Sequence, residues 1–169
     1  MQKKFTPSFI FWLILAKISI LGIDQFLKYL SVSQQHDFFI WAKKLGFVFN
    51  INPDIAFNIQ IPRYGFIISV TIFFALFIWQ YVFAWRAKEK LLIWGYALFI
   101  IGALSNLIDR VIYGYVVDYL YFAPVSYLNL ADIAIVVGAL MFGGQILYGR
   151  LRGLFKRKKL KSVVGKNTP

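Results

Sequence analysis

The sequence predicts an all-α integral membrane protein with four transmembrane helices. The chain has 169 residues, of which 60% are hydrophobic, and its mean hydropathy is +0.66. Its apolar residues gather in four stretches of about 20, the length that a helix needs to cross a bilayer. Most of its basic residues lie between or beyond these stretches. A soluble domain of this length could not bury so much apolar surface, so we expect a single membrane domain over residues 1–155.

None of the four stretches alternates apolar and polar residues, and each is too long for a barrel strand, which leaves helices as the spanning structure. The expected spans are Phe9–Tyr29, Tyr64–Trp85, Leu91–Ile108 and Leu130–Tyr148. Lys3 and Lys4 before the first span are typical of a signal peptide. No small-residue cleavage site follows and Lys17 interrupts the run, so a retained signal anchor is expected.

The charge pattern predicts the orientation. The net charge is +12, from 19 basic and 7 acidic residues. The basic residues cluster before the first span, between the second and third, and after the fourth, which is typical of cytoplasmic flanks and not of a nucleic-acid-binding surface. Both termini are therefore expected in the cytoplasm, and residues 31–63 and 109–129 outside. The run Gly149–Lys161 is expected to touch anionic lipid, and residues 156–169 to form a basic, disordered tail.

One segment outside the spans is expected to form strands. Leu45–Ile61 is rich in Phe, Val and Ile around Asn-Pro-Asp, which favours short strands and a small sheet at the outer surface.

The counts of cysteine and histidine exclude several chemistries. The chain has no cysteine and one histidine, His36, which we interpret as a solvated loop residue. Disulfides, thiol chemistry and histidine-rich metal sites are therefore excluded, and no metal or cofactor is expected.

Polar residues of three spans fall at one depth. At about 1.5 Å per helical residue, Asp24 lies about 22 Å above the inner face, Asn106 lies near the same height, and Asp109 lies one turn higher. Asp132 lies about 27 Å above Arg150. Three pairs share a helix face: Asp24 and Lys28, Asn106 and Asp109, and Asn129 and Asp132. A charge inside a span is costly unless it is partnered, so this convergence predicts a functional site near the outer edge of the membrane.

Five motifs appear in the order "DQFLK", "NPDIAF", "NLIDR", "VVD" and "NLAD" between Gly22 and Gly144. Together they resemble the signatures of the lipoprotein signal peptidases (signal peptidase II), the membrane aspartyl proteases of bacteria. The resemblance implies four transmembrane helices with a small extracytoplasmic β-cradle and a short outer helix. It implies Asp118 and Asp132 as the catalytic pair, in the bacterial inner membrane near its outer face. The implied substrate is a prolipoprotein with diacylglycerol on its cysteine, cut just before that cysteine.

The chain departs from the family pattern at three places. Asp54, preceded by Pro53, stands where the family has glycine, and we interpret it as a turn residue. Leu128 replaces the usual phenylalanine before Asn129. The interval between the two catalytic aspartates is also shorter than expected.

Paired carboxylates provide a route to peptide hydrolysis without metal, thiol or histidine. Two close aspartates share a proton, so the ionised one can take a proton from water while the neutral one polarises the scissile carbonyl. The remaining polar residues are expected to support this pair or the peptide: Asn52, Asn106, Asp109, Arg110, Asn129, Asp24 and Lys28. Asn129 is also expected to cap the fourth helix.

Other interpretations remain open. Asp118 could be an ordinary loop acid, Asp132 could be an acid favoured by a helix dipole, and Asp109 and Arg110 could form a simple interfacial ion pair. For the whole chain the alternatives are a small ion or proton transporter and a non-catalytic assembly protein. A transporter predicts acids spread through the membrane depth or repeated halves, and neither pattern is present.

Overall fold

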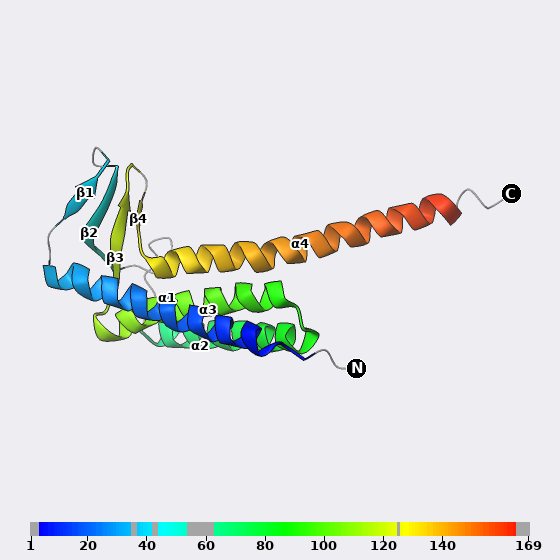
Figure 1. Cartoon of the computed structure of the whole chain (residues 1–169), viewed down its shortest axis with the longest axis horizontal. Helices are drawn as coiled ribbons and strands as arrows, with labels where there is room; N and C mark the ends of the chain where they lie inside the picture. Colours follow the sequence, from blue (N-terminus) through cyan, green and yellow to red (C-terminus); the bar gives the residue numbers. More distant parts are fainter. Residues whose placement is uncertain (1–3, 35–36, 42–43, 54–62, 125, 165–169) are drawn as a thin grey trace.

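A computed structural model describes residues 4–34, 37–41, 44–53, 63–124 and 126–164, with side chains omitted at 63–66 and 154–164. The described chain forms four long helices: α1 (Pro7–Gln34), α2 (Arg63–Ala87), α3 (Lys90–Ile112) and α4 (Leu130–Val164). Each contains a stretch long and apolar enough to cross a membrane. The helices run side by side, and a small sheet stands at one end of the bundle (Figure 1). The predicted four-helix membrane fold is confirmed.

The sheet has four antiparallel strands in the order β1-β2-β3-β4. The strands are β1 (Phe38–Ile40), β2 (Leu45–Asn52), β3 (Val116–Phe122) and β4 (Ser126–Leu128). The sheet predicted around residue 45 is therefore present, with two further strands from the segment between α3 and α4. No separate short outer helix occurs in the described ranges, although residues 54–62 lie outside them.

A bulge in β2 shapes the part of the sheet nearest the helices. Phe47 pairs with Leu120, but the next pair is Asn50 with Asp118, so two residues of β2 face one residue of β3. Such a bulge bends a strand and changes where its later side chains point. After the bulge β2 ends at Asn52, opposite Val116. The Ser31 hydroxyl of α1 donates to the carbonyl of Val48 at 2.7 Å, which ties the bulged strand to the bundle.

Glycines bring α3 and α4 into close contact. A Cβ at Gly102 would meet the carbonyl oxygen of Ala131 and lie 2.9 Å from Ile135 Cγ1. A Cβ at Gly138 would lie 2.5 Å from the carbonyl oxygen of Gly95. Small residues at helix contacts allow such approach inside a membrane, where packing replaces the hydrophobic effect. The close contact brings the last turns of α3 next to the first turn of α4.

Three helices extend beyond their predicted ends. Helix α1 was expected to end at Tyr29 and continues to Gln34. The third span was expected to end at Ile108, but α3 continues to Ile112, so Asp109 and Arg110 lie in its last turns. Helix α4 continues to Val164, which places residues 156–164 of the expected disordered tail in a helix that extends past the bundle (Figure 1). The division of the chain into a domain ending at 155 and a separate tail stays a prediction.

Candidate active site

A buried lysine lies at the centre of the polar cluster. Lys28 of α1 is 1% exposed, and its ammonium nitrogen lies 2.8 Å from Asp24 Oδ2 and 2.8 Å from Asp109 Oδ2. It also donates to Asn106 Oδ1 at 2.9 Å. A buried ammonium group is tolerated when all its protons have partners, and here three acceptors surround it. The cluster therefore joins α1 to the end of α3.

Asp24 extends this cluster to β3 and α4. Its Oδ2 accepts a hydrogen bond from the Ser105 hydroxyl at 2.7 Å. Its Oδ1 accepts one from the Tyr119 hydroxyl at 2.9 Å and one from the backbone N–H of Ala131 at 3.1 Å. The Tyr119 hydroxyl in turn accepts from the Leu130 N–H at 3.0 Å. Asp24 thus satisfies a backbone donor at the start of α4, where a carboxylate is favourable.

Asp109, the second carboxylate that contacts Lys28, also accepts hydrogen bonds from α1 and β3. Its Oδ1 accepts from Gln25 Nε2 at 2.9 Å, and its Oδ2 accepts from the Val117 N–H at 3.2 Å. Gln25 Nε2 also donates to the Ser105 hydroxyl at 2.9 Å. Asp109 therefore forms its salt bridge with Lys28, which it faces across the contact of α3 with α1. The interfacial pair between Asp109 and Arg110 stays a prediction.

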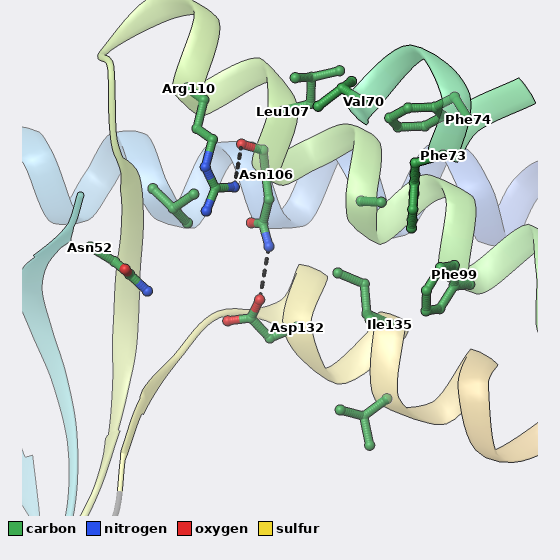
Figure 2. Close-up of a pocket in the computed structure, with 13 residues that line it drawn as sticks. Asn52, Val70, Phe73, Phe74, Phe99, Asn106, Leu107, Arg110, Asp132 and Ile135 are labelled. Carbon is green, nitrogen blue, oxygen red and sulfur yellow. Dashed lines mark hydrogen bonds between the residues drawn. The ribbon is translucent and has the colours of Figure 1, made fainter. Parts of the chain in front are cut away.

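Asn106 connects the lysine cluster to Asp132. Its Oδ1 accepts from Lys28, and its Nδ2 donates to Asp132 Oδ1 at 2.8 Å. Figure 2 shows this second bond crossing from α3 to the start of α4. Arg110 Nη1 lies 3.4 Å from the carbonyl oxygen of Asn106, so the guanidinium stands beside the same residue.

Asn129 joins the two predicted catalytic carboxyls. Its Oδ1 accepts from the Asp132 N–H at 2.8 Å, and its own N–H donates to Asp132 Oδ2 at 3.2 Å. This reciprocal pair caps α4, as predicted. Its Nδ2 donates to Asp118 Oδ1 at 2.8 Å. One side chain therefore contacts both aspartates.

Asp118 lies on β3 and is 2% exposed. Its Oδ2 accepts from Asn52 Nδ2 at 3.0 Å, across the two central strands of the sheet. Burial raises the pKa of Asp118 to about 6, and the nearby Asp132 acts in the same direction, against the hydrogen bonds from Asn52 and Asn129. Burial also raises the pKa of Tyr119, so this phenol stays protonated and donates to Asp24.

A cavity of about 440 Å³ opens beside Asp132 between α2, α3 and α4. Its apolar lining includes Val70, Phe73, Phe74, Phe99, Leu107 and Val136. Asn52, Asn106, Arg110 and Asp132 line it as well, and Figure 2 shows these four side chains together near the sheet. A cavity with an apolar wall and a polar end suits an apolar ligand whose reacting group is polar.

The structure thus brings together every residue that the sequence placed in the site: Asp118, Asp132, Asn52, Asn106, Asp109, Arg110, Asn129, Asp24 and Lys28. It adds Gln25, Ser105 and Tyr119, which the sequence analysis did not select. Gln25 belongs to a quoted motif, so its position beside Asp24 was an available signal. Asp54 and His36 lie outside the described residues.

The fold and the site together define a polytopic membrane protein with two neighbouring carboxyls, one buried and one lining a cavity, at one end of its bundle. The family profile described as signal peptidase (SPase) II matches residues 16–148. The chain therefore belongs to the signal peptidase II family, and it is a protease.

Curated relatives agree with this assignment, and a solved structure shares the fold. The lipoprotein signal peptidase of Caldicellulosiruptor bescii is 30% identical, over 89% of this chain and 99% of its own length. That of Moorella thermoacetica is 31% identical, over 79% of this chain and 91% of its own. A solved bacterial membrane enzyme shares the fold with a TM-score of 0.71 at 23% identity, over 88% of this chain and 93% of its own. None of these likenesses supports the transporter alternative.

Proposed function

We propose that the chain is an aspartic endopeptidase that removes signal peptides from diacylglyceryl-modified prolipoproteins, cutting just before the lipidated cysteine. The observation that carries the aspartic chemistry is the position of Asn129, whose side chain contacts Asp118 at 2.8 Å and the Asp132 backbone at 2.8 Å. Asn129 thereby contacts both carboxyls: its side-chain Nδ2 donates to Asp118 Oδ1, and its backbone N–H donates to Asp132 Oδ2. Membership of the signal peptidase II family supports the reaction and the class of substrate.

The proposed reaction needs one proton on the pair. The ionised carboxyl takes a proton from water, and the neutral one polarises the scissile carbonyl. The site is buried at one end of the apolar bundle, so these electrostatic effects act in a low dielectric. No cofactor takes part. Asn52, Asn106 and Asn129 orient the pair, and Arg110, which lines the cavity, would hold a backbone carbonyl of the substrate. Asp24, Lys28 and Asp109 hold the helices that carry these groups.

The cavity supports an apolar substrate that arrives through the membrane. Its phenylalanines lie on α2 and α3, and its polar residues lie at the sheet end next to Asp132. The prolipoprotein would bring an apolar signal peptide and two acyl chains to such a surface. We propose membrane lipid and the prolipoprotein as the partners of a chain that acts as a monomer and binds no nucleic acid.

The proposed location is the bacterial cytoplasmic membrane, with both termini in the cytoplasm and the active site near the outer face. Helix ends rich in basic residues support this orientation, because the turn between α2 and α3 lies at the end of the bundle away from the sheet (Figure 1). The exposed basic residues there include Arg86, Lys88 and Lys90, and α4 adds Arg150 and Arg152.

The test is cleavage of a lipidated prolipoprotein by the purified protein. Asp118→Asn and Asp132→Asn should each reduce cleavage at least about a thousandfold while insertion into the membrane stays normal. Asp37→Asn, which changes an exposed aspartate of the same outer region, is the matched control and should cleave at the parent rate. Near-parent turnover by either active-site variant would rule out the aspartic mechanism.

A further inference from the structure

We propose that, in the free enzyme, the proton shared by the catalytic pair resides on Asp118 Oδ2, and that Asp132 is the ionised partner. This inference rests on the proposed function and assigns separate roles to the two carboxyls. Its basis is the direction of the hydrogen bonds around the pair. Three of the four carboxyl oxygens face donors that cannot reverse.

Lys28 fixes the direction of the bond from Asn106 to Asp132. An ammonium group only donates hydrogen bonds, so the amide oxygen of Asn106 must face it, at 2.9 Å. The amide nitrogen then faces Asp132 Oδ1, at 2.8 Å. Turning the amide over would place its N–H groups against the ammonium. Asn106 is thus held as a donor to Asp132.

Backbone groups fix the direction of the bonds made by Asn129. The N–H of Asp132 only donates, so the Asn129 amide oxygen must face it, at 2.8 Å. Asn129 Nδ2 is then left to donate to Asp118 Oδ1, at 2.8 Å. The backbone N–H of Asn129 donates to Asp132 Oδ2 at 3.2 Å. Both oxygens of Asp132 therefore face fixed donors, and its position in the first turn of α4 favours the anion.

Among the described residues, no contact fixes the direction of the Asn52 amide. Within the described residues, its side chain makes one hydrogen bond, in which Nδ2 lies 3.0 Å from Asp118 Oδ2. If this amide turns over, its oxygen can accept an O–H from Asp118. Because the nitrogen and oxygen of an amide have nearly the same size, the turn needs no other movement. Asp118 Oδ2 is therefore the position where a proton meets an acceptor without breaking a fixed hydrogen bond.

The charges around the pair favour such a proton. The charged groups near the pair are Asp24 and Lys28 of α1 and Asp109 and Arg110 of α3. The protonated Tyr119 of β3 lies beside them. With both catalytic carboxyls ionised, four aspartates would face two cations in a buried cluster. One bound proton removes half of this excess negative charge. The burial of Asp118, which raises its pKa to about 6, acts in the same direction.

The assignment gives each carboxyl one task. Asp132, which lines the cavity, takes a proton from water as the water oxygen bonds to the scissile carbonyl carbon. Asp118 gives its proton to the carbonyl oxygen, which forms a gem-diol. When the C–N bond breaks, the proton on Asp132 goes to the leaving nitrogen and one diol proton returns to Asp118. The products are a carboxylic acid and an amine, and the pair recovers its starting state.

Infrared spectroscopy of the full chain without substrate tests this assignment, and it is independent of whether the chain cleaves prolipoproteins. Spectra would be recorded at about pH 5 and about pH 7.5, on either side of the Asp118 transition. The parent should gain a buried, protonated carboxyl band at the lower pH. Asp118→Asn should lose this band, and Asp132→Asn, which keeps the burial of Asp118, should retain it. Exposed carboxyls contribute equally to all three proteins. A band that persists in Asp118→Asn, or that is absent from the parent, would overturn the proposal.

Discussion

Replacing Asp118 with asparagine should stabilise the folded protein at neutral pH, although it removes a proposed catalytic group. The folded state holds this carboxyl at 2% exposure, so its ionised form lacks most of the hydration that it has in the unfolded chain. Asparagine has the shape of a protonated aspartate. Its oxygen can accept from Asn129 Nδ2, and its N–H can donate to a turned Asn52 amide. The variant therefore keeps the hydrogen bonds and avoids the buried charge.

The size of the effect follows from the pKa of Asp118. Burial raises this pKa from its ordinary 3.8 to about 6. A shift of about two pH units at about 1.4 kcal/mol each corresponds to about 3 kcal/mol. Because the folded pKa is the higher one, the stability that the proton supplies is complete below about pH 4 and is lost as the pH rises through about 6. Asp118→Asn should thus be about 3 kcal/mol more stable than the parent at about pH 7.5, with a gain near zero at about pH 4.

Thermal unfolding in detergent, followed at both pH values, measures this difference. A gain of about 3 kcal/mol corresponds to a rise in Tm of about 6–12 °C for a chain of this length. Asp37→Asn, in which an exposed carboxyl is replaced, is the matched control and should shift Tm little at either pH. If Asp118→Asn has the parent's Tm at about pH 7.5, or a gain that does not depend on pH, the burial argument is wrong.

Three further predictions concern packing, charge and orientation. Gly102→Ala should cost about 1–3 kcal/mol of unfolding free energy and lower cleavage, because its Cβ would press on the α4 backbone. The control is Gly144→Ala, whose Cβ meets nothing within 4 Å, and this change should be neutral or stabilising by about 1 kcal/mol. Equal changes in unfolding free energy for the two variants would contradict the close contact of α3 and α4. Lys28→Met should destabilise by about 3–5 kcal/mol because two buried carboxylates lose their cation, while Lys28→Arg should cost less than half of that; similar losses would mean that the charge is unimportant. A cysteine at Pro124 should react with an impermeant label on intact cells and one at Lys88 only after permeabilisation, and the reverse pattern would overturn the orientation.

The helices and the polar layer could be predicted because each depends on local features of the sequence. Long apolar stretches specify spans, and a charge within a span demands a partner at a similar depth. Asp24, Asn106 and Asp132 were therefore correctly placed at one level. The cap of α4 by Asn129 also follows from local spacing, since an N-cap bonds to the N–H three residues later.

The partners of individual charges could not be predicted, because they depend on how the helices rotate against one another. The salt bridge of Asp109 with Lys28, for example, depends on the contact of α1 with α3. The strand β3 was missed in the analysis of the residues, although Val116–Phe122 is rich in β-branched and aromatic residues. Asp118 within this segment is compatible with a polar loop, which is why a loop acid was one interpretation of it. That aspartate is buried because β3 lies against the bundle, which no local pattern reports.

The most direct test of the account is a double-mutant comparison of the catalytic pair in the cleavage assay. Purified Asp118→Asn, Asp132→Asn and the double variant would be incubated with lipidated prolipoprotein long enough to measure residual cleavage. If the two carboxyls act as one unit, the double variant should be no slower than the slower single variant. Losses that multiply in the double variant, or substantial cleavage by either single variant, would contradict a shared catalytic role for Asp118 and Asp132.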